Sequence, residues 1–198
     1  PNAEPPVSPS LGYLARLSPL KGLDLLVDAF IALKESGKHD NLQLKIAGGM
    51  TAEDQPFVEE QRNKLVRAGF NDFFSISPNI TREEKLNFLK NLSAFSVPAR
   101  YPEAFGLYVV EAMLAGIPVV LPDSGAFPEI IETTKGGKLY DPTASAGLKE
   151  ALDEMLSDPK DAKLMGMKAH RAVLEKYANE KLAKMLVEEV VFPLPVNK

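Results

Sequence analysis

Two carboxylates, eight positions apart, flank a glycine in the stretch Glu103–Glu111. A helix turns about 100° per residue, so eight positions on one helix would leave the two side chains roughly 80° out of line. They converge on one ligand only if Glu103 lies in a loop and Glu111 on the helix that follows, and Gly106 permits the sharp turn between them. The N–H groups of a helix start bind anions. The spacing therefore predicts an anion near Gly106 with a hydroxyl-bearing group on either side, which is the shape of a nucleotide sugar.

Arg16 and Lys21 form a second candidate group, because Arg16 ends an apolar run and Lys21 lies in the turn before the next helix. A guanidinium grips two oxygens in a fixed fork and an ammonium supplies a point charge, so two cations at one strand end suit a diphosphate. The alternative is a solvated basic pair on the surface. The position at a strand end favours the functional interpretation.

Two other features are weaker signals. The loop Ser77–Ile80 could present its backbone to a flat base with Ile80 beside it, and a simple helix-entry loop explains it equally well. Glu111 could be an ordinary acid on a helix surface. Its neighbours Val109, Val110 and Met113 leave that helix little polar surface, however, so we expect Glu111 to have a polar partner.

Short apolar runs alternate with longer amphipathic segments along the chain, which positions these groups. We expect strands at residues 11–17, 42–47, 73–76, 94–97, 117–121 and 137–140, and helices at 22–36, 54–68, 81–91, 106–115, 127–132, 144–156, 160–177 and 179–190. Regular strand–helix alternation is typical of parallel strands joined by crossover helices. The sequence therefore predicts an α/β, Rossmann-like, doubly wound sheet of about six parallel strands, with its ligand beyond the carboxyl ends of the strands.

Composition limits the remaining possibilities. The chain has 198 residues, of which 45% are hydrophobic, enough for one sizeable domain. Four prolines among the first ten residues predict a linker at 1–10, followed by a domain at 11–177 and a C-terminal helix and tail at 178–198. No cysteine is present and the two histidines are far apart, so we expect neither disulfides nor a metal site. A net charge of −4 argues against a nucleic-acid partner.

At these motifs the chain resembles the C-terminal, nucleotide-sugar-binding half of a retaining glycosyltransferase of the two-Rossmann GT-B type. It is most similar to family 4, which includes sucrose synthases and bacterial mannosyltransferases and glucosyltransferases. Segment 12–22 resembles the family's Gly-Arg-Leu…Lys-Gly motif, and Glu103–Glu111 its Glu-x7-Glu motif. Segment 111–120 resembles its Glu-Ala-Met-Ala-x-Gly-x-Pro-Val-Val run, with Leu114 in place of the common alanine. Ser77 departs from the family's usual glycine before the base-contacting loop.

The resemblance implies a role for each candidate residue. The implied catalytic residues are Arg16 and Lys21, which would stabilise the leaving diphosphate, and Glu103, which would lie near the anomeric carbon of the donor sugar. The implied donor-binding residues are Arg16, Lys21, Ile80, Glu103, Phe105, Gly106, Leu107, Tyr108 and Glu111. Among them, the backbone N–H groups of residues 106–108 would hold the phosphates and Glu111 would bind the ribose. The resemblance implies no metal or other cofactor, and a donor such as a UDP-, GDP- or ADP-hexose.

In the family the acceptor, a sugar, lipid or other small molecule, binds to an N-terminal Rossmann domain. We therefore expect this chain alone to bind nucleotide weakly and to catalyse no transfer. No apolar run approaches the roughly 20 residues that span a bilayer. We expect a cytoplasmic protein, and docking at the inner face of the membrane stays open. Two alternatives also stay open: a GT-B sugar-nucleotide epimerase or phosphorylase, and a non-catalytic nucleotide-sugar-binding module.

Overall fold

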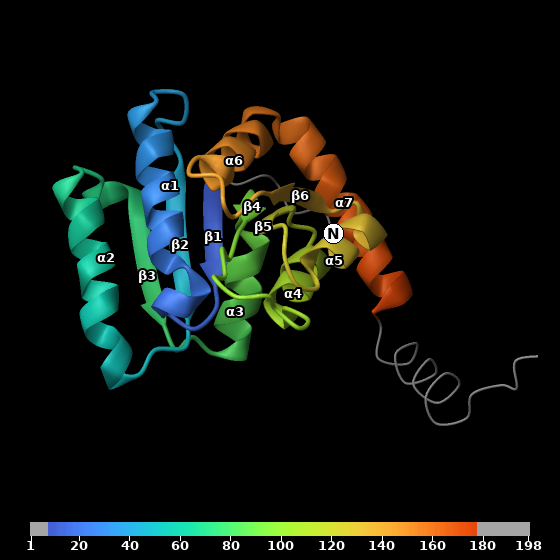
Figure 1. Cartoon of the computed structure of the whole chain (residues 1–198), viewed down its shortest axis with the longest axis horizontal. Coiled ribbons are helices and arrows are strands. Elements are labelled where there is room, and N and C mark those ends of the chain that lie inside the picture. Colours follow the sequence, from blue (N-terminus) through green and yellow to red (C-terminus); the bar gives the residue numbers. More distant parts are fainter. Residues whose placement is uncertain (1–7, 178–198) are drawn as a thin grey trace, which may run out of the picture.

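Six parallel strands form one sheet in the computed structural model, which describes residues 8–177 (Figure 1). Their order is β3-β2-β1-β4-β5-β6. The strands are β1 (Ser10–Leu14), β2 (Gln43–Gly48), β3 (Phe74–Pro78), β4 (Ala94–Phe95), β5 (Val119–Pro122) and β6 (Gly137–Tyr140). Every neighbouring pair is parallel. This confirms the predicted doubly wound α/β sheet.

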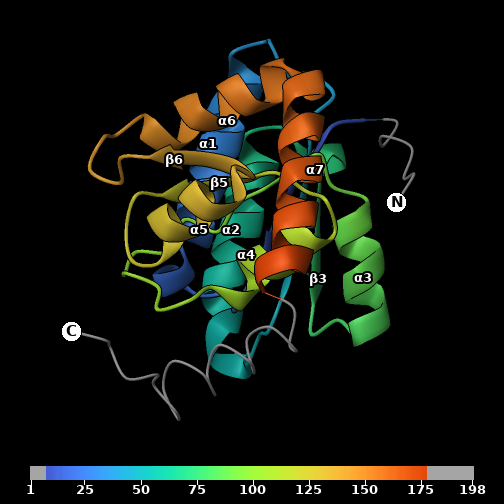
Figure 2. The same ribbon diagram turned by 90° about the vertical axis from the view of Figure 1, so that its right-hand side faces the viewer.

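Helices cover both faces of this sheet: in Figure 2, which views the sheet from its β6 edge, α1 and α2 lie to the left of β3 and α3 lies to its right. The helices are α1 (Leu23–Glu35), α2 (Gln55–Arg67), α3 (Arg82–Lys90), α4 (Leu107–Leu114), α5 (Phe127–Thr134), α6 (Gly147–Ser157) and α7 (Pro159–Lys176). Helix α1 contacts α2 and α6, whereas α4 and α5 both contact α7. Such two-sided cover explains why the strands read as apolar runs rather than as alternating patterns.

The core is densest around the central strand β1, all five residues of which are buried. Leu11 and Tyr13 on this strand are completely inaccessible to solvent. The edge strand β3 is only half-buried and ends at Pro78, which has no N–H to leave unpaired at a sheet edge. The aromatic side chains of Tyr13, Phe30 and Phe95 are fully buried in the core, whereas those of Phe73, Phe74 and Phe88 pack against it and are only partly buried.

Several predicted boundaries are shifted, and two of the shifts concern β1. Ser10 was expected in the linker but begins β1, because its N–H donates to the Ser93 hydroxyl, 3.1 Å away, inside the sheet. Strand β1 ends at Leu14 rather than at residue 17, so Arg16 lies in the loop beyond the strand. The predicted helix 179–190, the tail 178–198 and residues 1–7 lie outside the described residues.

The sheet's strand order reverses at β1, which has β2 on one side and β4 on the other. The loops that follow β1 and β4 are fastened together there. Gly22 has a φ of +70°, and a Cβ on it would lie 1.9 Å from the Pro98 carbonyl oxygen. The Arg100 N–H donates to the Leu20 carbonyl over 3.0 Å, and its guanidinium holds both carboxylate oxygens of Asp24. Such reversals are where doubly wound sheets bind ligands.

Candidate functional site

The site centres on an ion pair between Lys21 and Glu103. Lys21 ends the single 3-10 turn Pro19–Lys21 after β1, and Glu103 lies in the loop between β4 and α4. The Lys21 ammonium donates to Oε1 of Glu103, and the two side chains are only 18% and 10% exposed. The Tyr108 hydroxyl donates to the same oxygen over 2.7 Å. The structure thus brings together three of the residues that the sequence singled out.

Aromatic rings flank the ammonium on two sides. The Lys21 nitrogen lies 4.8 Å from the centre of the Tyr101 ring and 5.2 Å from that of the Tyr108 ring. Both distances are within the range of a favourable cation–π contact. The sequence analysis did not select Tyr101, because a single tyrosine in a loop carries no periodic signal.

The electrostatics of this cluster keep both partners charged. Burial by itself would lower the pKa of Lys21, but hydrogen bonds to Glu103 and Tyr101 outweigh it and the pKa is raised. Burial would likewise raise the pKa of Glu103, but the hydrogen bonds from Lys21 and Tyr108 lower it below its ordinary value. Burial and then the bond to Glu103 raise the pKa of Tyr108, so its hydroxyl keeps its proton at neutral pH.

The loop after β5 holds the backbone of Glu103. Gly125 has a φ of +58°, and a Cβ there would lie 2.5 Å from both the nitrogen and the oxygen of Glu103. The Ala126 N–H donates to the Glu103 carbonyl over 2.9 Å. This loop follows the fifth strand in sequence but supports the acid that follows the fourth.

Gly106 forms the predicted break between Glu103 and the helix that carries Glu111. It caps α4 with a φ of +73°, and a Cβ there would lie 2.8 Å from the Phe127 ring. Across residues 8–177, the backbone N–H groups of Gly106, Leu107 and Tyr108 donate to no protein acceptor. Helix starts of this kind supply amides and a partial positive charge to an anion.

Phe105 and Leu107 lie on either side of that glycine and are partly open to solvent. The Phe105 side chain packs edge-on against Tyr177, just beyond the end of α7, with ring centres 6.0 Å apart. Leu107 is 69% exposed. In this structure Phe105 therefore joins the site to the C-terminal end of the described chain.

Glu111 has the polar partner that its apolar neighbours led us to expect. The Lys85 ammonium on α3 donates to its Oε1, and the side chains of the lysine and the glutamate are 30% and 40% exposed. The sequence analysis missed Lys85, since an isolated lysine on an exposed helix looks like a solubilising residue. The pair joins α3 to α4, and the Glu111 side chain stays partly exposed to solvent.

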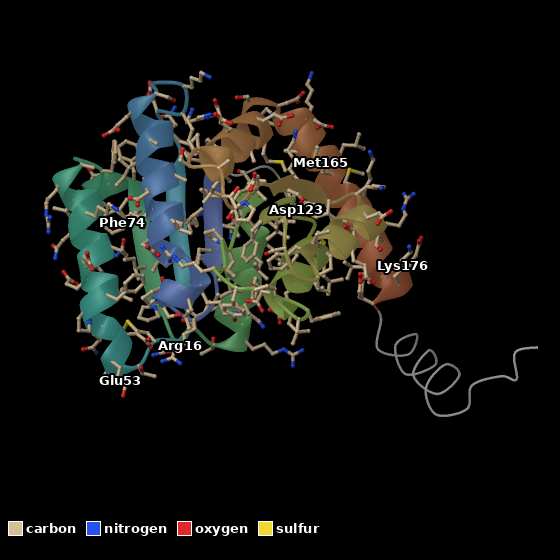
Figure 3. The ribbon with its side chains drawn as sticks, in the orientation of Figure 1. Arg16, Glu53, Phe74, Asp123, Met165 and Lys176 are labelled. Atoms are coloured by element: carbon tan, nitrogen blue, oxygen red, sulfur yellow. The ribbon has the colours of Figure 1, made fainter. Side chains whose placement is uncertain are left out.

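Arg16 is paired with a carboxylate of its own. Its guanidinium lies 3.3 Å from Asp54, at the start of α2, and its side chain is 56% exposed. Asp54 accepts hydrogen bonds from the backbone and hydroxyl of Thr51, which lower its pKa. Arg16 appears at the lower edge of the molecule in Figure 3, and Glu53, the neighbour of Asp54 in the turn before α2, lies below it. Each of the two predicted cations therefore has its own protein partner.

The loop that carries Ile80 is clamped to the loop after β2. Asn79 adopts a φ of +55°, its N–H donates to Gly48, and its side-chain amide pairs with the N–H and carbonyl of Met50 over 2.9 and 3.0 Å. The Asn79 N–H is therefore already bonded and is not free for a base edge. Ile80 is partly buried and lines a hollow of about 360 Å³ between α3 and strands β2 and β3.

Neither a metal-binding cluster nor a membrane-spanning helix occurs in the part of the chain that the structure describes. Within residues 8–177, no group of three or more histidine, aspartate or glutamate side chains is arranged to hold a metal ion. None of the helices that the structure describes is long and apolar enough to cross a membrane.

A sequence model of the family described as "Glycosyl transferases group 1" matches residues 2–172 of the chain. The chain belongs to this family. It is 31% identical over 179 residues to the lipopolysaccharide core biosynthesis mannosyltransferase of Rhizobium leguminosarum bv. viciae, covering 89% of this chain and 49% of the relative. It is 27% identical over 186 residues to the GDP-mannose-dependent α-(1-6)-phosphatidylinositol monomannoside mannosyltransferase of Mycobacterium tuberculosis, covering 91% and 46%. The chain thus spans about half the length of these relatives.

Solved structures agree with this assignment. The C-terminal domain of a glycosyl transferase group 1 family protein from Francisella tularensis matches with a TM-score of 0.76 at 25% identity, covering 88% of this chain and 89% of that one. Sucrose-phosphate synthase from Thermosynechococcus elongatus matches with a TM-score of 0.80 at 24% identity, covering 92% and 45%. The predicted resemblance to the C-terminal half of a GT-B glycosyltransferase is confirmed.

Proposed function

We propose that this chain is the donor-binding half of a retaining glycosyltransferase that transfers a hexose from a nucleotide diphosphate sugar to an acceptor. The observation that carries the proposal is the buried Lys21–Glu103 pair beside the free amides of residues 106–108, at the point where strand order reverses. The relatives named above are mannosyltransferases, one of them GDP-mannose-dependent. An Anabaena protein of the same fold, with a TM-score of 0.77 at 23% identity over 90% of this chain and 48% of that one, was solved with UDP and glucose.

In the proposed mechanism the diphosphate binds to the amides of α4, and Lys21 turns from Glu103 toward it. The bond between the anomeric carbon and the diphosphate oxygen breaks while the acceptor oxygen bonds to that carbon. The acceptor's proton passes to the leaving phosphate. Lys21 and the amides stabilise the charge on the leaving group, and the more exposed Arg16 adds a second cation at its edge. We propose that these groups neutralise the diphosphate with no metal ion or other cofactor.

Glu103 acts on the sugar side of the same step. A sugar that loses its leaving group gathers positive charge at the anomeric carbon, as in other glycosyl-transfer chemistry. A carboxylate whose pKa is held low stays ionised beside it and accepts hydrogen bonds from the sugar hydroxyls. Glu111 accepts hydrogen bonds from the ribose hydroxyls, and these bonds replace the one from Lys85. The acceptor and the rest of the active site lie outside this chain.

Calorimetric titration of the chain with UDP, GDP and ADP and with their sugar forms tests donor binding. We expect at least one nucleotide diphosphate to bind, and Lys21→Met to weaken that binding about tenfold or more. The control is Lys163→Met, which removes an exposed charge on α7. Binding by no diphosphate, or equal losses in the two variants, would overturn the proposal.

Transfer is tested in the whole protein with a radiolabelled donor. The variants Lys21→Met and Glu103→Gln should both lose transfer, and wild-type transfer should persist in EDTA. Normal transfer by both variants would mean that the site only binds nucleotide sugars. We expect the present chain by itself to catalyse no transfer.

A further inference from the structure

We propose that the hydroxyl of Tyr108 is the positioning group for Glu103, and that it keeps this carboxylate in place once the donor diphosphate has drawn Lys21 away. This inference rests on the proposed function. It assigns to the Tyr108 side chain a role separate from the role of its backbone N–H in phosphate binding.

Lys21 and Tyr108 share one carboxylate oxygen of Glu103. Oε1 of Glu103 accepts from both the Lys21 ammonium and the Tyr108 hydroxyl. A cation that turns toward a diphosphate cannot keep its full bond to Glu103. The Tyr108 hydroxyl then remains as the donor to Glu103, and it stays uncharged while it donates.

The Tyr108 ring is anchored independently of Lys21. It lies in the first turn of α4 and packs against Phe95 of β4, with ring centres 6.4 Å apart and the planes tilted by 44°. A phenol on a packed ring has few accessible rotamers, so its oxygen is a better-fixed reference than the end of a lysine chain. The same turn supplies the phosphate-binding amides, so the hydroxyl and the amides keep a constant spacing.

A buried Glu103 carboxylate without hydrogen-bond donors would be costly to keep ionised. The residue is only 9% exposed, and a buried carboxylate that loses its hydrogen bonds takes up a proton rather than stay ionised. A protonated Glu103 could not stabilise positive charge on the sugar. The Tyr108 hydroxyl therefore keeps Glu103 anionic at the moment when its charge is needed.

The charged and titratable groups that face Glu103 come from three elements. Lys21 approaches from the loop after β1, Tyr101 from the loop after β4 and Tyr108 from α4. Tyr13 on β1 lies behind them and donates its hydroxyl to the carbonyl of Arg16 instead, over 2.9 Å. Tyr101 is 36% exposed, so its contact with the pair is more open to water than that of Tyr108.

A ligand-free double-mutant cycle tests the inference, with Lys21→Met standing in for a lysine that has turned away. The carboxyl pKa of Glu103 is measured by ¹³C NMR titration of the glutamate-labelled chain, and its resonance is assigned by its loss in Glu103→Gln. We expect Tyr108→Phe in the Lys21→Met background to raise this pKa by at least about one unit. An unchanged pKa would overturn the inference, because a merely structural tyrosine would not set the carboxyl's titration.

Tyr140→Phe is the matched control, since it removes the hydroxyl of a buried tyrosine on β6 and should leave the titration of Glu103 unchanged. If Lys21→Met fails to fold, Tyr108→Phe alone is compared with the wild type, and a higher Glu103 pKa is again expected. An equal Glu103 pKa in Tyr108→Phe and the wild type would overturn the positioning role of Tyr108. Because these titrations contain no nucleotide, they stay readable even if the chain binds none and the proposed function fails.

In the whole enzyme, Tyr108→Phe should lower kcat about tenfold or more while the KM for the donor changes less than threefold. The acid limb of the pH profile should shift upward with the pKa of Glu103. A rise in KM alone, or an unshifted acid limb, would contradict the positioning role even in an active glycosyltransferase.

Discussion

Lys21 and Glu103 lie 82 positions apart in the sequence and form a largely buried ion pair at the point where the strand order of the sheet reverses. The site therefore neutralises its central cation with its own carboxylate. On the proposed function, an incoming diphosphate would compete with Glu103 for Lys21. This competition gives each of the two residues a measurable effect on ligand binding.

Removing the charge of Glu103 should strengthen the binding of a free nucleoside diphosphate. Glu103→Gln releases Lys21 and removes a negative charge near the phosphates, so we expect binding to tighten about threefold to tenfold by calorimetry, or ~0.7–1.4 kcal/mol. Transfer in the whole protein should nevertheless be lost. Glu154→Gln, which removes an exposed acid on α6, should change neither quantity. Weaker diphosphate binding by Glu103→Gln would show that the two residues do not compete.

Gly106→Ala should destabilise the fold and abolish nucleotide binding. The residue has a φ of +73°, and the new Cβ would lie 2.8 Å from the Phe127 ring. Gly37→Ala is the matched control, with a φ of +71° and no atom within 4 Å of the new Cβ. We expect Gly37→Ala to cost about 1–2 kcal/mol in urea unfolding, the usual cost of a left-handed conformation, and to leave binding intact. Equal costs for the two variants would mean that the contact with Phe127 is unimportant.

Glu111→Gln should weaken the binding of a nucleoside diphosphate about tenfold and leave inorganic pyrophosphate binding unchanged. The reason is that Glu111 is proposed to contact the ribose, which pyrophosphate lacks. Lys85→Met removes only the half-exposed partner, so it should cost less than about 1 kcal/mol of stability and should not weaken nucleotide binding. Equal losses for both ligands in Glu111→Gln would place that residue against the phosphates instead.

Asp153 on α6 should stabilise the fold at neutral pH and lose this effect in acid. Hydrogen bonds from His39 and Lys38, beyond the end of α1, lower the pKa of Asp153 to about 2. Its pKa in the unfolded chain is about 3.9, so its stabilising effect is present above that pH and is lost as pH falls toward 2. In urea unfolding, Asp153→Asn should be less stable than wild type at pH 6, and the difference should shrink by pH 2. The exposed Asp72→Asn should show no such convergence.

Much of the fold could be predicted because the spacing of apolar residues along the chain follows from which side chains are buried. The central strands read as continuous apolar runs, and each of the six predicted strands overlaps an observed one. Boundaries were less predictable, since Ser10 is polar yet lies inside the sheet through its bond to Ser93. The site motif was also visible, because Glu103, Gly106 and Glu111 have a spacing that few structural demands would produce.

The pairing of charges could not be predicted in the same way. Lys85 is partly exposed and Asp54 is buried, and nothing in their local sequence distinguishes either from a solvated charge. Their partners, Glu111 and Arg16, come from other elements of the fold. Which loops meet depends on strand order, and strand order is set by the packing of the whole sheet.

The amino-acid sequence alone determined the α/β class, the order of the elements and the candidate residues in the loops after β1 and β4, because these depend on local propensity and on apolar periodicity. Only the tertiary structure decided that Lys21 is paired with Glu103, that Tyr108 shares the same carboxylate oxygen, and that Arg16 is held by Asp54. Contacts between distant segments form when the sheet brings two loops together, and no local pattern records which side chains then meet.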